Sequence, residues 1–126
     1  MSRKHSAIRS FGYAGNGVKE AFLNEPNFRV HVIVAIVSIV LAFYFQFSAT
    51  KFAVLILTIT FVIILELLNT VIEKVVDKIS PNYSPLAKVA KDVSAAAVLI
   101  SAFAATLVGI LLFLPNILLL LSSLTH

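Results

Sequence analysis

Four polar side chains interrupt an apolar segment in the middle of the chain, and their types and spacing make them the first candidates for chemistry. On a helix with about 100° per residue, they fall at roughly 0°, −60°, −20° and +20°, which is one face. They are Glu66, Asn69, Glu73 and Asp77, hereafter the polar stripe. An acid inside a membrane helix costs about 2 to 3 kcal/mol even on gentle insertion scales, so it usually faces a protein interior and serves a function.

The two glutamates of the stripe are expected to have different roles. Glu66 and Glu73 lie two turns apart, about 10 Å along a helix, which is too far for both to bind one ion as neighbouring ligands. Glu73, near the headgroups, is suited to join Glu25 in holding a hard cation such as Mg²⁺. Glu66 is deeper, where partial desolvation suits a carboxylate to accept a proton. Lys91 and Asp92 open the next apolar segment on the same side, where a lysine can neutralise phosphate.

These residues would place a base inside the membrane, a metal ion near the headgroups and a lysine at the membrane boundary. Such a site suits phosphoryl transfer to a lipid hydroxyl, because that reaction needs mainly positioning and charge neutralisation. No Walker loop, kinase glycine-rich loop or zinc motif is present, so a nucleotide site would be of an unrelated type. Two alternatives stay open on these residues alone. The stripe can hold an oligomer together in a non-catalytic assembly protein, or its intramembrane acid can serve a small transporter or proton-relay subunit.

The composition indicates an integral membrane protein. The 126 residues are 60% apolar and 13% charged, which is not a soluble composition. Residues 32–50 and 93–125 carry no charge, and Glu66 is the only charge within residues 52–72. Each run meets the roughly 20-residue requirement of a transmembrane helix. We predict an all-α chain with three spans, at about residues 28–47, 52–73 and 91–114.

The apolar run of the third span continues into a tail over residues 115–126. As one helix the whole run would measure about 50 Å, against a hydrocarbon core of about 30 Å. Pro115 and Asn116 are therefore expected to break the helix, with the tail lying in the outer interface or extending the span.

Before the first span, an amphipathic surface helix is predicted over about residues 5–25. Five of its residues share a sector of about 80° at helical spacing. They are Ile8, Phe11, Gly15, Val18 and Phe22. We expect this helix to lie on the membrane surface with its polar residues facing water.

The basic residues predict the orientation in the membrane. All ten Lys and Arg residues except Lys51 lie either within residues 3–29, up to the start of the first span, or within residues 74–91, between the second span and the start of the third. The positive-inside rule then places the N-terminus and the 73–92 connection in the cytoplasm and the 46–51 turn outside. The charge of +4 is thus topogenic and does not indicate a nucleic-acid partner. Cysteine is absent, which excludes thiol catalysis and cysteine metal sites.

Four sequence blocks resemble a known family in their order and spacing. They are Asn24-Glu25-Pro26-Asn27-Phe28-Arg29, Glu66 to Glu73, Val76-Asp77 and Ala90-Lys91-Asp92-Val93. It is that of the small bacterial integral-membrane lipid kinases, the diacylglycerol and undecaprenol kinases. The resemblance covers about residues 6–114. It implies a kinase that uses ATP and Mg²⁺ on diacylglycerol or undecaprenol in the bacterial cytoplasmic (inner) membrane. It further implies a homotrimer whose active sites are shared between neighbouring subunits.

The resemblance also implies roles for single residues. Glu66 matches the catalytic base, Glu25 and Glu73 match metal ligands, and Asn69 and Asp77 match polar residues essential to the site. Positions that match nucleotide contacts are Tyr13, Asn82, Tyr83, Ser84, Lys91 and Asp92. The set expected to face the lipid is Glu66, Asn69 and Ala95.

Some positions depart from the pattern of other members. An arginine of some members falls on Ser6, so its role is expected to have moved to Arg9. A serine that some members carry after Ala-Lys-Asp aligns with Ala95, and Ser94 lies beside it. His31 and the Ser-Pro pairs within residues 80–85 are more similar to the Gram-positive undecaprenol-kinase branch than to the enterobacterial diacylglycerol-kinase branch.

Overall fold

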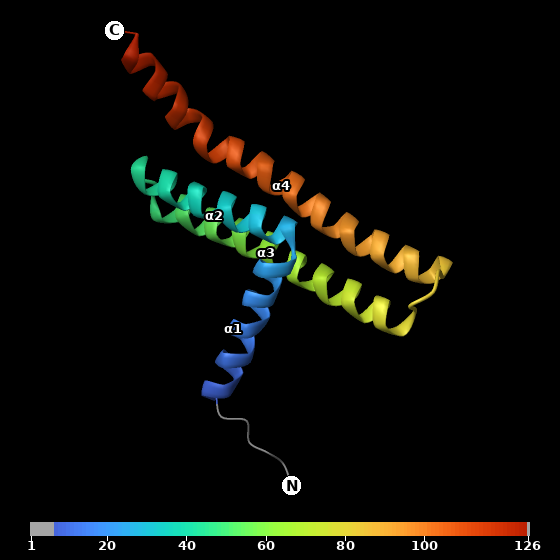
Figure 1. The fold of residues 1–126 in the computed structure, drawn as a ribbon. Helices are drawn as coiled ribbons and strands as arrows, with labels where there is room; N and C mark the ends of the chain where they lie inside the picture. Colours follow the sequence, from blue (N-terminus) through green and yellow to red (C-terminus); the bar gives the residue numbers. More distant parts are fainter. Residues whose placement is uncertain (1–6, 126) are drawn as a thin grey trace.

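The computed structural model describes residues 7–125, and over that range the chain consists of four helices and contains no strand (Figure 1). They are α1 (Ala7–Asn24), α2 (Pro26–Tyr44), α3 (Ala49–Ile79) and α4 (Pro85–Leu124). The last three are long and apolar enough to cross a membrane. The predicted all-α class with three potential spans is therefore confirmed. Ser6 and the start of the predicted surface helix lie outside the described residues.

Helix α3 is the centre of the arrangement. Figure 1 shows α2 and α3 as an antiparallel hairpin with α4 running alongside, while α1 points away from these three helices. The most extensive packing is between α3 and α4, and α3 also contacts α2 and α1. The helix that carries the polar stripe is thus the one that every other helix touches.

The junction of α1 and α2 fixes the position of Glu25. Its backbone is extended, with φ −108° and ψ 106°, and Pro26 begins α2. Proline is favourable in a first helical turn because its missing N–H needs no partner there. Arg29 reaches back from α2 and donates to the carbonyl oxygen of Leu23 at 3.0 Å, which satisfies a free carbonyl near the end of α1. Phe28 is buried in this corner.

At the other end of the hairpin, an aromatic contact holds α4 in place. Gln46 adopts φ 51°, in the left-handed region, where the chain reverses. Ser48 then caps α3, its hydroxyl accepting from the Lys51 backbone N–H at 3.4 Å. The ring of Phe47 packs against that of Phe113 of α4, with centroids 4.8 Å apart. This contact anchors α4 to the far end of the hairpin.

The predicted break at Pro115 and Asn116 is wrong, because α4 is one continuous helix of 40 residues that contains Pro115. Proline removes one backbone hydrogen bond from a helix interior. A full break in an apolar environment would leave more backbone groups without partners, and each of these costs several kcal/mol. Asn116 lies level with the hairpin turn, where Lys51 donates to its side-chain oxygen at 3.4 Å. Residues 117–124 then continue as helix for about 12 Å.

Candidate functional site

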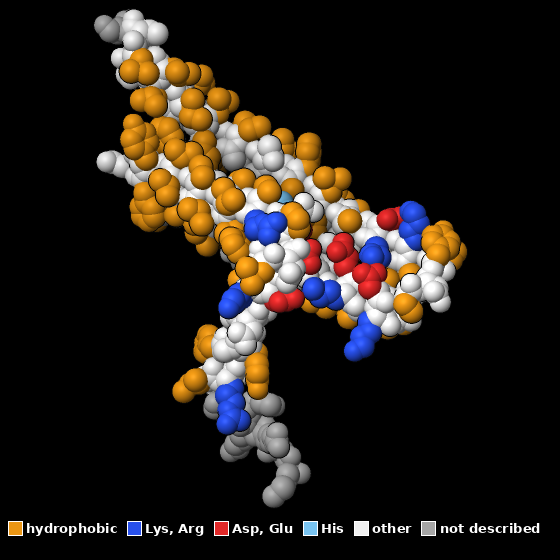
Figure 2. All heavy atoms as spheres, in the orientation of Figure 1, with side chains coloured by type: hydrophobic (Ala, Val, Ile, Leu, Met, Phe, Trp, Pro, Cys, Tyr) orange, Lys and Arg blue, Asp and Glu red, His pale blue; other side chains and the backbone are white. Residues whose placement is uncertain are grey.

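The polar stripe lies on α3, toward the end of the bundle where α1 joins and α3 connects to α4. Glu66 is buried, with 3% of its surface exposed, Asn69 and Glu73 are half-buried, and Asp77 is exposed. Exposure therefore rises along the stripe toward the α3–α4 connection. In Figure 2 the acidic side chains and several basic ones gather in this region, whereas hydrophobic side chains predominate on the visible face of the rest of the bundle.

Glu66 faces α2. Its carboxylate oxygen Oε2 lies 4.0 Å from Nε2 of His31. The next polar residue on that face, Thr70, donates its hydroxyl to the Glu66 backbone carbonyl at 3.1 Å. A buried carboxylate is costly unless polar groups are near, and His31 is the polar group that α2 supplies. The sequence did not identify His31 as a partner of Glu66; the available signal was a polar ring one turn into an apolar span.

Asn69 connects the stripe to α4. Its Nδ2 donates to Oε1 of Glu73 at 3.1 Å, and its Oδ1 accepts from the hydroxyl of Ser94 at 2.6 Å. Ser94 is buried, whereas its neighbour Ala95 is exposed. The sequence singled out Ala95, and one residue along a helix turns a side chain by about 100°. The signal for Ser94 was its spacing of seven residues, two turns, from Ser101, which is also buried on α4.

At the open end of the stripe, a salt bridge joins α3 to α4. Lys91 donates from Nζ to Oδ1 of Asp77 at 2.7 Å. Asp92, the next residue, pairs instead with Lys88 of its own helix. Lys91 thus contacts the stripe within one chain, whereas Asp92 faces another side of α4.

Glu25 approaches the stripe from the α1–α2 junction. Its charge and that of Glu73 both act electrostatically on Glu66, so the three carboxylates share one region. Over residues 7–125, however, no group of three or more His, Asp or Glu side chains is arranged to hold a metal ion. Mg²⁺ is usually held by one or two carboxylates together with substrate phosphates. Glu25 and Glu73 have carboxylate oxygens, the kind of ligand that such a cation takes.

The remaining predicted nucleotide contacts lie on α1 and in the α3–α4 connection. Tyr13 is on the exposed α1, which points away from the bundle in Figure 1. Asn82 and Tyr83 are exposed in the α3–α4 connection. Ser84 caps α4, its hydroxyl accepting from the Ala87 N–H at 3.4 Å. Arg9, to which a displaced arginine role was assigned, is also exposed on α1.

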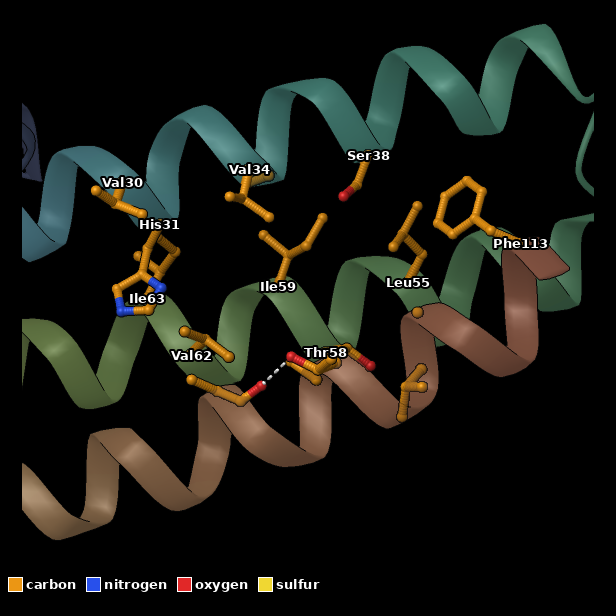
Figure 3. A pocket seen from close by; sticks show the side chains of 16 residues that line it. Val30, His31, Val34, Ser38, Leu55, Thr58, Ile59, Val62, Ile63 and Phe113 are labelled. Atoms are coloured by element: carbon orange, nitrogen blue, oxygen red, sulfur yellow. Dashed lines mark hydrogen bonds between the residues drawn. The ribbon is translucent and has the colours of Figure 1, made fainter. Parts of the chain in front are cut away.

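A cavity of about 420 Å³ lies between α2, α3 and α4 and extends from His31 to Phe113 (Figure 3). Its walls are mainly aliphatic, with hydroxyls from Ser38, Thr58 and Thr106. Since His31 is also the residue beside Glu66, the buried carboxylate lies near one end of an apolar space.

Comparison with known proteins decides the family. The sequence pattern of the prokaryotic diacylglycerol kinase family matches residues 12–113, which contain the whole polar stripe, Glu25 and Lys91. The chain belongs to this family. Its membership does not favour a transporter subunit or an assembly protein. With three helices able to span a membrane, this family member is a multi-pass membrane protein.

The relatives have two different names. The chain is 47% identical to a diacylglycerol kinase of Synechocystis over 110 residues, which are 86% of this chain and 63% of that protein. It is 38% identical to the undecaprenol kinase of Bacillus subtilis, over 87% of this chain and 89% of that protein. It is 36% identical to the diacylglycerol kinase of Escherichia coli, over 79% and 82% respectively. The chain thus spans slightly less than two thirds of the Synechocystis relative and most of the other two.

Proposed function

We propose that this chain transfers the γ-phosphoryl group of ATP to the primary hydroxyl of a membrane lipid, either diacylglycerol or undecaprenol. The products are phosphatidic acid or undecaprenyl phosphate. Its family makes the chain a membrane lipid kinase; the donor, the acceptor hydroxyl and the residue roles are the proposal. One observation carries it: a buried carboxylate, Glu66, lies near an apolar cavity and is followed along α3 by a polar track that leads to the half-buried Lys91.

Glu66 is the proposed base. It accepts the proton of the lipid hydroxyl as the hydroxyl oxygen bonds to the γ-phosphorus and the bond to the β–γ bridging oxygen breaks. A carboxylate removed from water and close to the bilayer interior can meet a hydroxyl that stays attached to an apolar chain. His31, 4.0 Å away, helps to hold the carboxylate in position.

Glu25 and Glu73 are the proposed ligands of Mg²⁺. When bound with ATP, the cation neutralises charge on the phosphates. Asn69 donates to Glu73 and so restrains the carboxylate. Lys91 adds a positive charge for the phosphates, and Asp77 holds its ammonium beside the stripe.

A homotrimer with shared sites is the proposed assembly. Asp92 pairs with Lys88 and not with the stripe, Tyr13 lies on α1, and residues 82–84 form the α3–α4 connection. A neighbouring subunit would allow these residues to complete a nucleotide site. α4 carries small residues every four positions, a pattern that allows close helix approach in membranes. They are Ala97, Ser101, Ala105 and Gly109.

The proposed placement has α1 on the cytoplasmic surface and the active site on the cytoplasmic side of the cell membrane. Ile8 and Phe11 of α1 are 81% and 79% exposed, which suits insertion of an apolar face among headgroups. The charge distribution supports the same orientation, because four lysines flank the α3–α4 connection on its two helices, whereas Lys51 alone lies beside the α2–α3 turn.

A phosphorylation assay tests the proposal. Purified protein in mixed micelles receives labelled ATP, Mg²⁺ and either diacylglycerol or undecaprenol, with the corresponding lipid esterified at its hydroxyl as the control. We expect label in at least one of the two free alcohols and none in the esters. Absence of label from both alcohols would reject the kinase.

A further inference from the structure

Ser94 is a buried hydroxyl that bonds across two helices. Four polar residues are buried in the described part of the chain: Glu66, Thr70, Ser94 and Ser101. Thr70 and Ser101 donate to carbonyls of their own helices, at 3.1 and 2.7 Å. The Ser94 hydroxyl also lies 2.9 Å from the Lys91 carbonyl oxygen of its own helix. Its shorter hydrogen bond, at 2.6 Å, is to Oδ1 of Asn69 on α3.

The chemistry of the three side chains fixes their order. Glu73 as a carboxylate only accepts, so Asn69 must turn its Nδ2 toward it, and the distance is 3.1 Å. The amide oxygen of Asn69 is then directed toward α4, where it needs a donor. Ser94 is that donor. The chain of donation runs from Ser94 to Asn69 to Glu73.

We propose that Ser94 is a positioning residue of the phosphoryl-transfer site, which locks the Asn69 amide so that Nδ2 holds the Glu73 carboxylate. The inference rests on the proposed function, because it takes Glu73 as a ligand of the cation. Without the hydroxyl, the amide oxygen of Asn69 loses its donor in a half-buried place, and only the bond to Glu73 then restrains the amide, so Glu73 is held less firmly.

Removal of a group that hydrogen-bonds a metal ligand typically weakens metal affinity about 10- to 100-fold, and Ser94 acts one step farther out, through Asn69. For Ser94→Ala we therefore expect about a tenfold rise in the Mg²⁺ concentration that gives half-maximal activity, with kcat at saturating Mg²⁺ nearly unchanged. Mn²⁺ binding in the presence of a non-hydrolysable ATP analogue, followed by electron paramagnetic resonance, should weaken by a similar factor. Ser94→Thr keeps the hydroxyl and should keep cation affinity within about threefold of wild type.

Ser101→Ala is the matched control. Ser101 is buried on the same helix two turns away, at 2% exposure. Its described hydrogen bond stays within α4 and is donated to the Val98 carbonyl. Its loss should leave Mn²⁺ affinity unchanged. In the double variant Ser94→Ala with Asn69→Ala, affinity should be no weaker than in Asn69→Ala alone, because Ser94 acts through Asn69.

Three results would overturn the inference: wild-type Mn²⁺ affinity in Ser94→Ala, the same loss in Ser101→Ala, or additive losses in the double variant. Mn²⁺ binding keeps this test separate from the proposed function. If wild-type protein phosphorylated neither lipid, the kinase proposal would fail, while the Mn²⁺ titrations would still decide whether Ser94 positions Glu73.

Discussion

At the scale of single residues, the Asp77–Lys91 salt bridge is expected to matter for turnover and not for stability. The two side chains are 65% and 39% exposed, and exposed pairs contribute only about 0 to 1 kcal/mol. Asp77→Asn should therefore change the free energy of unfolding by less than about 1 kcal/mol. The freed Lys91 would no longer be held beside the stripe, so we expect KM for ATP to rise about fivefold or more.

Unfolding in sodium dodecyl sulfate and ATP titrations of the kinase reaction measure the two effects. The control is Lys74→Met, which breaks another exposed pair, that of Lys74 with Glu20 of α1. A large loss of stability in Asp77→Asn with an unchanged KM would show that the pair is structural.

The sequence predicted which residues of α3 share a face, because helical periodicity alone decides that. Glu66, Asn69 and Glu73 lie on one side of α3 in the structure as their spacing requires. Their partners were not predictable in the same way. Whether Ser94 or Ala95 meets Asn69, and whether His31 meets Glu66, depends on how α4 and α2 are rotated against α3, and the packing of whole helices sets that rotation.

At the scale of helices, the aromatic contact at the hairpin turn is expected to stabilise the bundle without affecting the chemistry. Phe47 is 8% exposed and packs on Phe113. Phe47→Ala should destabilise the protein by about 3 kcal/mol, in the range for truncation of a buried phenylalanine. Glu66 lies 19 residues farther along, about 28 Å of helix, so kcat of the folded fraction should stay within about twofold.

Detergent unfolding with parallel activity measurements tests this prediction. Phe61→Ala is the control, because Phe61 of α3 is 58% exposed. Its loss should cost less than about 1 kcal/mol. Equal destabilisation by both variants would mean that the Phe47 contact does not anchor α4.

The three potential spans were predictable because the length of an apolar run is a strong and local signal. The continuation of α4 through Pro115 was not predictable in this way. The rule that proline ends a helix comes from chains in water, where freed backbone groups find solvent; in hydrocarbon, continuing the helix through Pro115 leaves fewer groups without partners.

At the scale of the whole molecule, burial of Glu66 is expected to lower the stability of the fold. A buried acid destabilises a membrane bundle, and a neutral amide of nearly the same shape lowers that cost. If the acid were present for assembly, its replacement would weaken the oligomer. If it is the base, replacement should leave the oligomer intact and remove turnover.

The most direct measurement is therefore the rate of lipid phosphorylation by Glu66→Gln, together with its oligomer size and its binding of a non-hydrolysable ATP analogue. We expect kcat to fall at least about 100-fold, the usual loss when a general base is removed. Oligomer size and nucleotide affinity should match those of wild type, and resistance to detergent should be equal or higher. A variant that retains more than about a tenth of wild-type kcat, or that loses activity only because the oligomer dissociates, would contradict the assignment of Glu66 as the base.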